Sequence, residues 1–401
     1  MKKKWLIIIP IIVILLVVGY FIGKKLYWDY RIKHAIIKVE LSTNQVEVYR
    51  PGMKLHMFLK ELNGTLETDP TIDTSSIGTK TVHFKYINEE NLPIEYSVEF
   101  EVVDITPPMI FMSKSKTITQ GYDSDLSNDL FCGDNYDPNP VCTIEGVYDV
   151  NTPGTYDLVF TGEDSSGNKS SNAFTLTVRR KSNSSGGGGG SSSYTDFNEI
   201  KETYKGENTH FGIDISHWQG DINFQRVKEA GVEFVYIRIG RGDGIGKDYV
   251  EDNKYLQNLK GFNDVGIPVG VYFYSNANSS KDAEKEAKWL LEKTKGFKVD
   301  LEYVYDWENW GDFQYYDFSF YGLKQSYQAF RKTIEKAGKK AMLYGSKSYM
   351  ESVWDSPSEV WLAHYTKQTN YMGNYKVWQL CDDGKVSGIN GYVDLDIRYG
   401  D

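Results

Sequence analysis

The sequence predicts a multidomain chain: an N-terminal transmembrane helix, two all-β sandwich modules, a linker and a C-terminal α/β barrel. Three observations lead to this fold class. An apolar run lies close to the start, short alternating strands recur through residues 36–179, and strands and helices alternate from His210 onward. A chain of 401 residues is long enough for two or three such domains.

The apolar run extends almost unbroken from Trp5 to Gly23, between Met1-Lys2-Lys3-Lys4 and Lys24-Lys25. Its length is close to the roughly 20 residues that a helix needs to cross a bilayer. No small-residue cleavage site follows it, so an uncleaved signal anchor is expected over residues 5–23. Lysines on both sides leave the orientation open. We place residues 1–4 in the cytoplasm because the remaining chain has an extracellular character.

Residues 36–104 and 105–179 each have the alternating apolar and polar pattern of half-buried strands. The pattern also repeats, because the turn and strand at Ile72–Val82 return at Tyr148–Leu158. Two sandwich modules of about 70 residues fit this spacing.

The second module, from Asp104-Ile105-Thr106-Pro107-Pro108 to Glu163-Asp164-Ser165-Ser166-Gly167-Asn168, resembles the bacterial Ig-like modules of cell-surface proteins. The first module resembles them more loosely. Such modules bind a ligand or act as a stalk, and a stalk is favoured here because no exposed chemical constellation is visible in either module.

Three cysteines exclude a scaffold built on disulfides but allow one bridge. Cys132 and Cys142 both fall within the second module, among turn residues, and outside the cell they are expected to close a short loop. Cys381 has no evident partner and no matching histidine pattern, so it is interpreted as a small buried residue rather than a nucleophile.

Residues 181–193 contain five glycines followed by three serines, a composition that cannot bury a core. The polar segment 194–208 is interpreted as its continuation, so the linker is expected to cover residues 181–208. The C-terminal domain, residues 210–401, would then swing freely on a stalk.

In residues 210–401, five strand–helix units are followed by three further strands, a pattern that predicts an irregular eight-stranded barrel of the TIM type. Its fourth strand is expected in the stretch Tyr303–Trp310 and ends in two acids, Asp306 and Glu308. Acids two apart on a strand leave from the same face. Two converging carboxyl groups are what glycoside hydrolysis needs. Asp214 lies at the end of the first strand, and barrel enzymes keep their chemistry at such strand ends.

The composition and the motifs of the sequence argue against several other classes of function. A net charge of −10 argues against nucleic acid as a partner. Neither a cluster of metal ligands nor a phosphate loop is visible, because Gly240-Arg241-Gly242-Asp243-Gly244 lacks the strand and P-loop context. No cofactor and no metal are therefore expected. An aromatic content of 14% fits either an aromatic core or sugar-stacking surfaces.

The C-terminal domain resembles glycoside hydrolase family 25, the Chalaropsis-type lysozymes that cut peptidoglycan. Besides the acid strand, the blocks that carry the resemblance occur in family order across the domain: residues 212–220, 230–238, 266–273, 361–365, 377–380 and 384–396.

The resemblance implies that Glu308 is the general acid and that Asp306 holds or polarises the 2-acetamido group of the sugar. Asp214 and Asp394 would complete the acidic ring. Asp396 stands where the family usually has asparagine, so the choice between Asp394 and Asp396 stays open. His217 would be a structural or subsite residue. Sugar stacking and core packing both remain possible for the other candidate substrate-binding residues, Tyr272, Tyr344, Trp361 and Tyr365.

The resulting expectation is a lysozyme, an N-acetylmuramidase, in the cell membrane of a Gram-positive-like cell, with its C-terminal domain outside. Its partners would be peptidoglycan strands, the membrane, and a cell-envelope, secretion or conjugation complex. Two alternatives stay open: a peptidoglycan-binding stalk or adhesin without activity, and a chitinase-type hydrolase. The latter is disfavoured because Leu301 and Val304 occupy positions where that class carries further acids.

Overall fold

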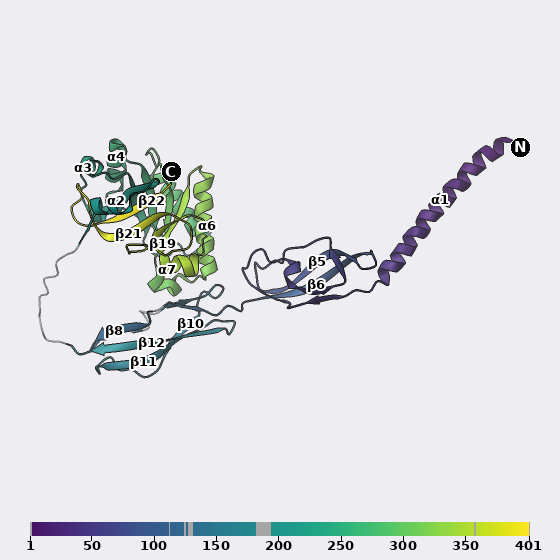
Figure 1. Cartoon of the computed structure of the whole chain (residues 1–401), viewed down its shortest axis with the longest axis horizontal. Helices are drawn as coiled ribbons and strands as arrows, with labels where there is room; N and C mark the ends of the chain where they lie inside the picture. The colour runs from purple at the N-terminus through teal and green to yellow at the C-terminus, as the bar shows by residue number, and fades with distance from the viewer. Residues whose placement is uncertain are drawn as a thin grey trace. The chain divides into compact units, whose positions relative to one another are not determined.

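The computed structural model describes residues 2–111, 113–123, 126, 131–181, 194–356 and 358–400, with side chains from Ile11 onward (Figure 1). The chain divides into two compact units, Met1–Thr106 and Pro107–Asp401. The glycine and serine run of the predicted linker, residues 182–193, lies outside the described residues.

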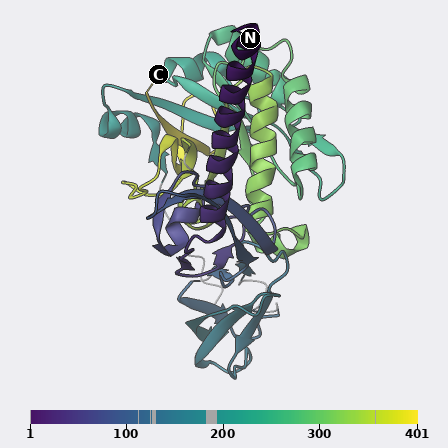
Figure 2. The same ribbon diagram turned by 90° about the vertical axis from the view of Figure 1, so that its right-hand side faces the viewer.

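The first unit begins with α1 (Lys2–Lys33), which is one unbroken helix in both views (Figures 1 and 2). Its stretch Ile11–Lys33 is long and apolar enough to cross a membrane, with a mean hydropathy of 1.8. The side chains of residues 1–10, which include part of the predicted span 5–23, lie outside the described ones. The helix continues past Gly23 because a single interior glycine costs only about 1 kcal/mol.

The same six-strand topology follows twice along the chain. In each copy the first and third strands pair, while the other four form a sheet in which a long hairpin lies between the second and fourth strands. The copy in the first unit has the strands β1 (Val39–Leu41), β2 (Gln45–Glu47), β3 (Leu59–Leu62), β4 (Gly64–Leu66), β5 (Gly78–Asn88) and β6 (Pro93–Val103), with the short 3₁₀ helix η1 (Leu55–Phe58). The hairpin of the first copy, β5–β6, starts at Gly78, within the repeated sequence segment Ile72–Val82.

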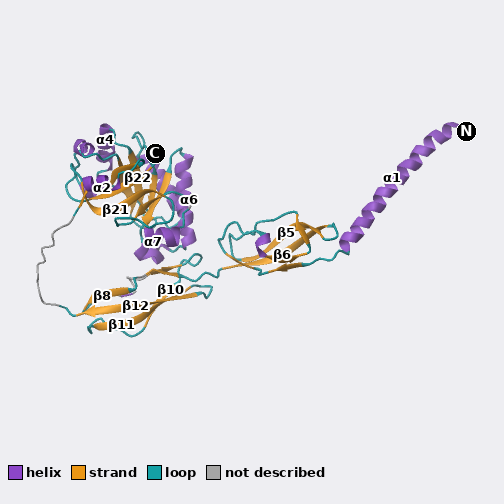
Figure 3. Ribbon diagram, in the orientation of Figure 1, coloured by secondary structure: helices purple, strands orange, loops and turns teal. Residues whose placement is uncertain are grey.

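The second copy, residues 107–179, is called the second β region below, and its strands are drawn in orange in Figure 3. They are β7 (Met109–Phe111), β8 (Ser115–Thr119), β9 (Phe131–Gly133), β10 (Val141–Glu145), β11 (Gly154–Glu163) and β12 (Lys169–Arg179). Cys132 and Cys142 form a disulfide that joins β9 to β10.

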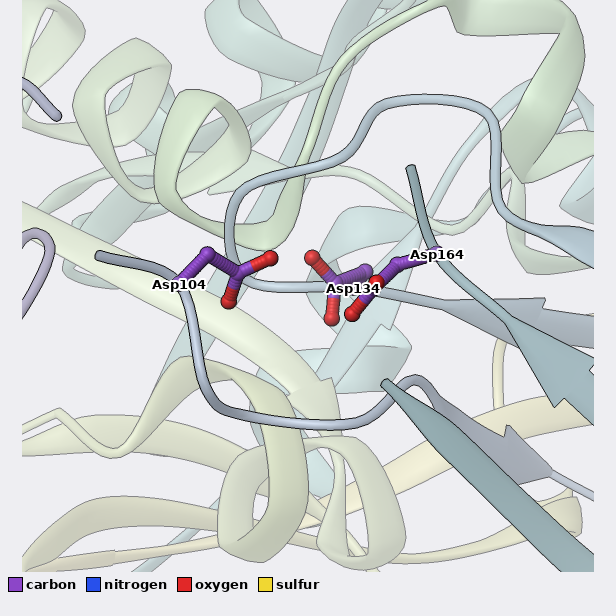
Figure 4. Close-up of side chains that lie close together, drawn as sticks. All are labelled: Asp104, Asp134 and Asp164. Atoms are coloured by element: carbon purple, nitrogen blue, oxygen red, sulfur yellow. The ribbon is translucent and has the colours of Figure 1, made fainter. Parts of the chain in front are cut away.

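Two buried carboxylates of this region, Asp134 and Asp164, lie with oxygens within 4.8 Å of each other (Figure 4). Asp104, also labelled there, belongs to the first unit. Asp134 accepts from the backbone N–H groups of Tyr136 and Asp137, at 2.8 and 2.7 Å, and Asp164 accepts from the backbone and side-chain nitrogens of Asn168. Each acid thereby orders the turn that follows it.

Eight strands of the C-terminal domain form a closed ring. Seven of them run parallel, in the order of the chain, and the last closes the ring by pairing antiparallel with both its predecessor and the first. They are β14 (Thr209–Ile215), β15 (Phe234–Gly242), β17 (Val269–Tyr274), β18 (Tyr303–Asp306), β19 (Ala341–Ser346), β20 (Val360–Ala363), β21 (Tyr375–Lys385) and β22 (Val393–Tyr399). The strands follow the predicted order, but sequence patterns did not show that β22 is antiparallel.

Five helical connections follow the first five strands of the ring, as expected, and Figure 3 shows helices and strands in this domain. The helical segments are η3 (His217–Gln219), α3 (Phe224–Glu229), α4 (Tyr255–Val265), α5 (Ser280–Lys293), η4 (Trp310–Tyr316), α6 (Phe320–Lys336), α7 (Lys347–Tyr349) and the π-helical turn η5 (Met350–Trp354). The short strand β16 (Tyr249–Glu251), which pairs with β15, was not predicted.

The prediction of a linker over residues 194–208 is wrong. β13 (Thr195–Asp196) adds to the barrel by pairing with β21, and α2 (Phe197–Tyr204) follows it. Asp196 caps α2 by accepting from the N–H groups of two residues in its first turn. Phe197 and Ile200 are buried in the barrel core, which explains why so short a helix is stable here.

The barrel is also not free to swing relative to the second β region. Both belong to one compact unit, and Phe111 and Phe131 pack against the barrel core. Backbone hydrogen bonds connect the two parts as well, for example from Phe320 N–H to the carbonyl of Asp134, at 2.8 Å.

Candidate active site

The four predicted acids meet at one end of the barrel. Asp214 and Asp306 lie at or next to the carboxyl ends of β14 and β18, and Glu308 follows two residues after Asp306. Asp394 lies at the start of β22, directly opposite Asp214 in the register of the two strands. Because β22 is antiparallel, its start faces the same end of the ring as the carboxyl ends of the parallel strands.

A cleft of about 280 Å³ opens at this end. Eight of the nine residues predicted to act in catalysis or substrate binding line it, and the ninth, Asp396, does not. The lining residues are Asp214, Ile215, Ser216, Trp218, Gln219, Arg238, Tyr272, Tyr274, Asp306, Glu308, Tyr344, Trp361, Tyr365, Gln379 and Asp394.

Asp306 and Glu308 form a pair of interacting carboxyl groups. Asp306 is buried, whereas Glu308 reaches solvent in the cleft. Burial and the neighbouring Glu308 charge raise the pKa of Asp306 well above its usual range. Desolvation by the protein around its carboxyl group also raises the pKa of Glu308. The pair therefore retains a proton to a higher pH than separate carboxyl groups would.

Gln379, on β21, connects the acids to the aromatic residues. Its Nε2 donates to Oδ2 of Asp214 at 2.8 Å, and its Oε1 accepts from the hydroxyls of Tyr344 and Tyr365 at 2.9 and 3.1 Å. Burial raises the pKa of Asp214 well above its usual range, and the charges of Asp394 and Asp396 add to the effect. The sequence analysis missed Gln379, although a polar residue between buried apolar neighbours on a strand was a usable signal.

The structure distinguishes Asp394 from Asp396. Asp394 is half-buried in the cleft, where burial and then the charge of Asp382 raise its pKa to about 7. Asp396 lies deeper, 1% exposed, and accepts from Nε1 of Trp361 at 2.8 Å. Residues two apart on a barrel strand face the same interior at different depths, which places only Asp394 at the cleft.

The predicted aromatic residues also divide into two kinds. Trp361 is 1% exposed and stacks on Tyr236, with ring centroids 4.6 Å apart, so it packs in the barrel interior below the cleft. Tyr272 and Tyr344 lie against Trp361, at 5.9 and 4.9 Å. Tyr365 has half of its side chain exposed, so its ring is open to a ligand.

Trp218 and Arg238 are two of the seven residues that line the cleft and that sequence reasoning did not select. Trp218, on η3, is 77% exposed. Arg238 donates from Nε and a terminal nitrogen to Oδ2 of Asp252, which also accepts from His217 N–H at 2.9 Å. The buried carboxylate of Asp252 thus holds both Arg238 and His217, and this fits the structural role expected for His217.

Comparisons with known proteins agree with this geometry. Residues 213–389 match the model of glycosyl hydrolases family 25. The autolytic lysozyme of Clostridium acetobutylicum is 30% identical over 192 residues, which are 46% of this chain and 54% of that protein. The uncharacterized protein YegX of Escherichia coli K12 is 29% identical over 203 residues, 48% of this chain and 70% of that protein.

Among solved structures, the modular autolysin LytC from Streptococcus pneumoniae, in complex with a synthetic peptidoglycan ligand, is 26% identical with a TM-score of 0.44. That match covers 60% of this chain and 56% of the other. The chain thus spans a little over half the length of LytC and of the clostridial lysozyme. Residues 213–389 form a glycosyl hydrolases family 25 domain.

Proposed function

We propose that the protein is a peptidoglycan hydrolase, an N-acetylmuramidase that cleaves the β-1,4 bond between N-acetylmuramic acid and N-acetylglucosamine. The observation that carries the proposal is the pair of neighbouring carboxyl groups, Asp306 and Glu308, that lines the cleft of a family 25 domain. Glycoside hydrolysis needs such a pair, with one group protonated.

In this proposal Glu308 is the general acid, because both acids line the cleft but only Glu308 is exposed, whereas Asp306 is buried. Its raised pKa keeps the carboxyl protonated at a pH where a free glutamic acid would be ionised. It donates this proton to the glycosidic oxygen, so the leaving sugar departs as a neutral alcohol.

Asp306 orients and polarises the 2-acetamido group of the sugar on which positive charge develops. The two groups share one proton, and once Glu308 has given it to the leaving oxygen, both carboxylates are negative and stabilise the cationic sugar. Water then adds to that sugar and returns a proton to the pair. Asp214 and Asp394 surround this position with further carboxyl groups. Tyr365 and Trp218, the exposed rings of the cleft, are the candidate surfaces for sugar stacking.

Loss of turbidity of purified peptidoglycan tests this function. The full chain in detergent is expected to clear the suspension and to release new reducing ends, and reduction of those ends is expected to convert muramic acid to muramitol. Glu308→Gln is the matched control. Binding of peptidoglycan without new reducing ends would favour the stalk or adhesin alternative, and reducing ends on N-acetylglucosamine would contradict the proposed bond.

We also propose that α1 anchors the protein in the cell membrane, with residues 1–4 inside and the rest of the chain outside. The apolar stretch of α1 and a catalytic domain that acts on the cell wall support this topology. The two six-strand units would then be Ig-like modules between the membrane and the barrel.

Protease treatment of wall-stripped cells tests the topology. Cleavage in the glycine run is expected to yield the C-terminal domain as a separate band on a denaturing gel. The second β region packs against the barrel, so the cut fragment is expected to stay on the cells until denaturant is added. Full protection of the chain on intact cells, with cleavage only after lysis, would contradict the topology.

A further inference from the structure

A two-stranded ribbon of the second β region faces the barrel. Its strands β7 and β9 pair antiparallel, with Phe111 directly opposite Phe131. The two rings stack at 4.6 Å with planes 5° apart, and both side chains are half-buried against the barrel core. A connection between sheets does not need two aromatic rings, and each large ring left exposed to water would cost free energy. The stacked pair therefore fits a ribbon that packs against another part of the protein.

The ribbon packs on the segment that follows Glu308. Phe131 lies 6.3 Å from Trp310 and 5.6 Å from Phe313, both on η4, measured between ring centroids. Phe111 lies 6.0 Å from Phe320, the first residue of α6. The contact therefore covers η4 and the start of the helix after it.

Polar contacts bracket the same segment. Gln314, in η4, donates from Nε2 to the carbonyl of Pro140 at 2.7 Å. The N–H of Phe320, one of the donors that a helix cannot satisfy in its first turn, reaches the carbonyl of Asp134. Between them, Asn139 donates to the carboxylate of Asp317.

Gly133 lies at a close approach between the two parts. A Cβ atom built on this glycine would lie 2.4 Å from Cζ of Phe320, which is closer than any real contact. The backbone of Gly133 is not in the left-handed region, so the close approach rather than its conformation requires glycine.

On the other side, η4 packs on the strand end that carries the acids. Trp307, fully buried next to Glu308, lies edge-on to Trp310 at 5.0 Å and to Phe313 at 5.8 Å. The N–H of Trp310 also donates to the backbone carbonyl of Glu308 at 2.8 Å. Glu308 thus sits between two tryptophans whose position depends on η4.

We propose that the β7–β9 ribbon is a positioning element of the active site, which holds η4 and through it keeps Glu308 in place to donate its proton. The proposal rests on the proposed function, because it assigns the ribbon a part in that reaction. The second β region is then a component of the catalytic unit, in addition to any role as a spacer.

Gly133→Leu in the full chain tests this, since the new side chain wedges the ribbon away from Phe320. The matched control is Gly154→Leu, in the same β region, where an added Cβ meets only Tyr156 at ordinary distances of 3.7 Å or more. We expect Gly133→Leu to lower kcat on peptidoglycan by about tenfold to a hundredfold, because an acid displaced by ~1 Å can lose about that factor. KM is expected to change little, and Gly154→Leu to behave as the unchanged protein.

A substrate with an activated aryl leaving group separates positioning from unfolding, because it needs little help from an acid. Gly133→Leu should be close to normal on that substrate, whereas a loss of folded protein would lower both activities equally. Phe131→Ala should reproduce the effect without a wedge, and Phe131→Leu should restore part of the activity. Equal losses on the two substrates, or full activity of Gly133→Leu on peptidoglycan, would overturn the proposal.

Amide hydrogen exchange keeps this test distinct from that of the function itself. In Gly133→Leu, and not in Gly154→Leu, exchange is expected to become faster in η4, whether or not the protein cleaves peptidoglycan. If the protein without substitutions does not cleave peptidoglycan, the proposed function is refuted and, with it, the role of the ribbon in catalysis. If the protein is active but Gly133→Leu leaves amide exchange in η4 unchanged, only the proposed hold of the ribbon on η4 is refuted.

Discussion

Glu308→Gln is expected to lower turnover on peptidoglycan by ~10²–10⁴-fold, the usual contribution of a general acid. Glutamine keeps the size and hydrogen-bonding capacity of the side chain but has no proton to deliver. The fold should be retained, because Glu308 reaches solvent and its removal relieves crowding with the buried Asp306. The measurement is kcat on purified peptidoglycan, with thermal unfolding as the check on folding.

Asp306→Asn is the comparison that identifies the donor. It should also reduce the rate, but by weakening the stabilisation of the sugar cation rather than by removing the proton. An activated aryl leaving group should therefore rescue Glu308→Gln in large part and Asp306→Asn little. Since Glu308 has a raised pKa, the activity of the protein without substitutions should fall as the pH rises through that pKa. Near-normal turnover of Glu308→Gln on peptidoglycan would show that another group is the donor.

Arg398→Met is expected to destabilise the barrel by about 3–5 kcal/mol, the usual cost of removing one partner from a buried ion pair. Arg398 is 5% exposed and makes a bidentate contact with Glu302, at 2.8 and 2.9 Å. Burial would raise the pKa of Glu302, but hydrogen bonds and the charge of Arg398 hold that pKa below its usual value. Without Arg398, the carboxylate would be left buried with only Tyr236 as a side-chain donor, at 2.6 Å.

Chemical denaturation of the C-terminal domain measures this effect. Lys260→Met is the matched control, because it removes the same charge from an exposed pair with Asp264 on α4. Such exposed pairs contribute about 0.3–0.5 kcal/mol. A cost below about 1 kcal/mol for Arg398→Met would mean that Glu302 takes up a proton or gains water at small expense. The Glu302→Gln/Arg398→Met double variant should recover part of the loss, because it leaves no buried charge.

Local patterns were enough to predict most of the barrel. The apolar residues of α5 repeat at helical spacing, which is enough to indicate that helix from the sequence alone. The acid strand was recognisable from its two acids, although the observed strand stops at Asp306 and Glu308 follows it. What failed were features that depend on distant contacts. α2 has only eight residues, and it was joined to the linker because its burial against the barrel leaves little trace in so short a segment.

The residues around the acids show the same limit. The alternation of a strand cannot tell Asp394 from Asp396, because both point inward and only the depth differs. Trp361 has the composition of a sugar-stacking residue, yet it lies in the interior with its indole bound to Asp396. Gln379 draws its importance from partners on three other segments of the chain, and no local pattern contains those. The packing of Phe131 on η4 joins residues about 180 positions apart and was equally invisible.

The antiparallel strand β22 also determines when during biogenesis the enzyme can become active. Thr209 pairs with Tyr399, so the ring closes through contacts between strands almost 190 positions apart. Such distant pairings form late and slowly. In the proposed topology, the residues nearest the membrane anchor leave a translocation pore first, so the ring cannot be completed until β22 has left the pore. Asp394 enters the cleft only with that strand, so under the proposed topology the finished acidic ring would exist only after β22 has been exported.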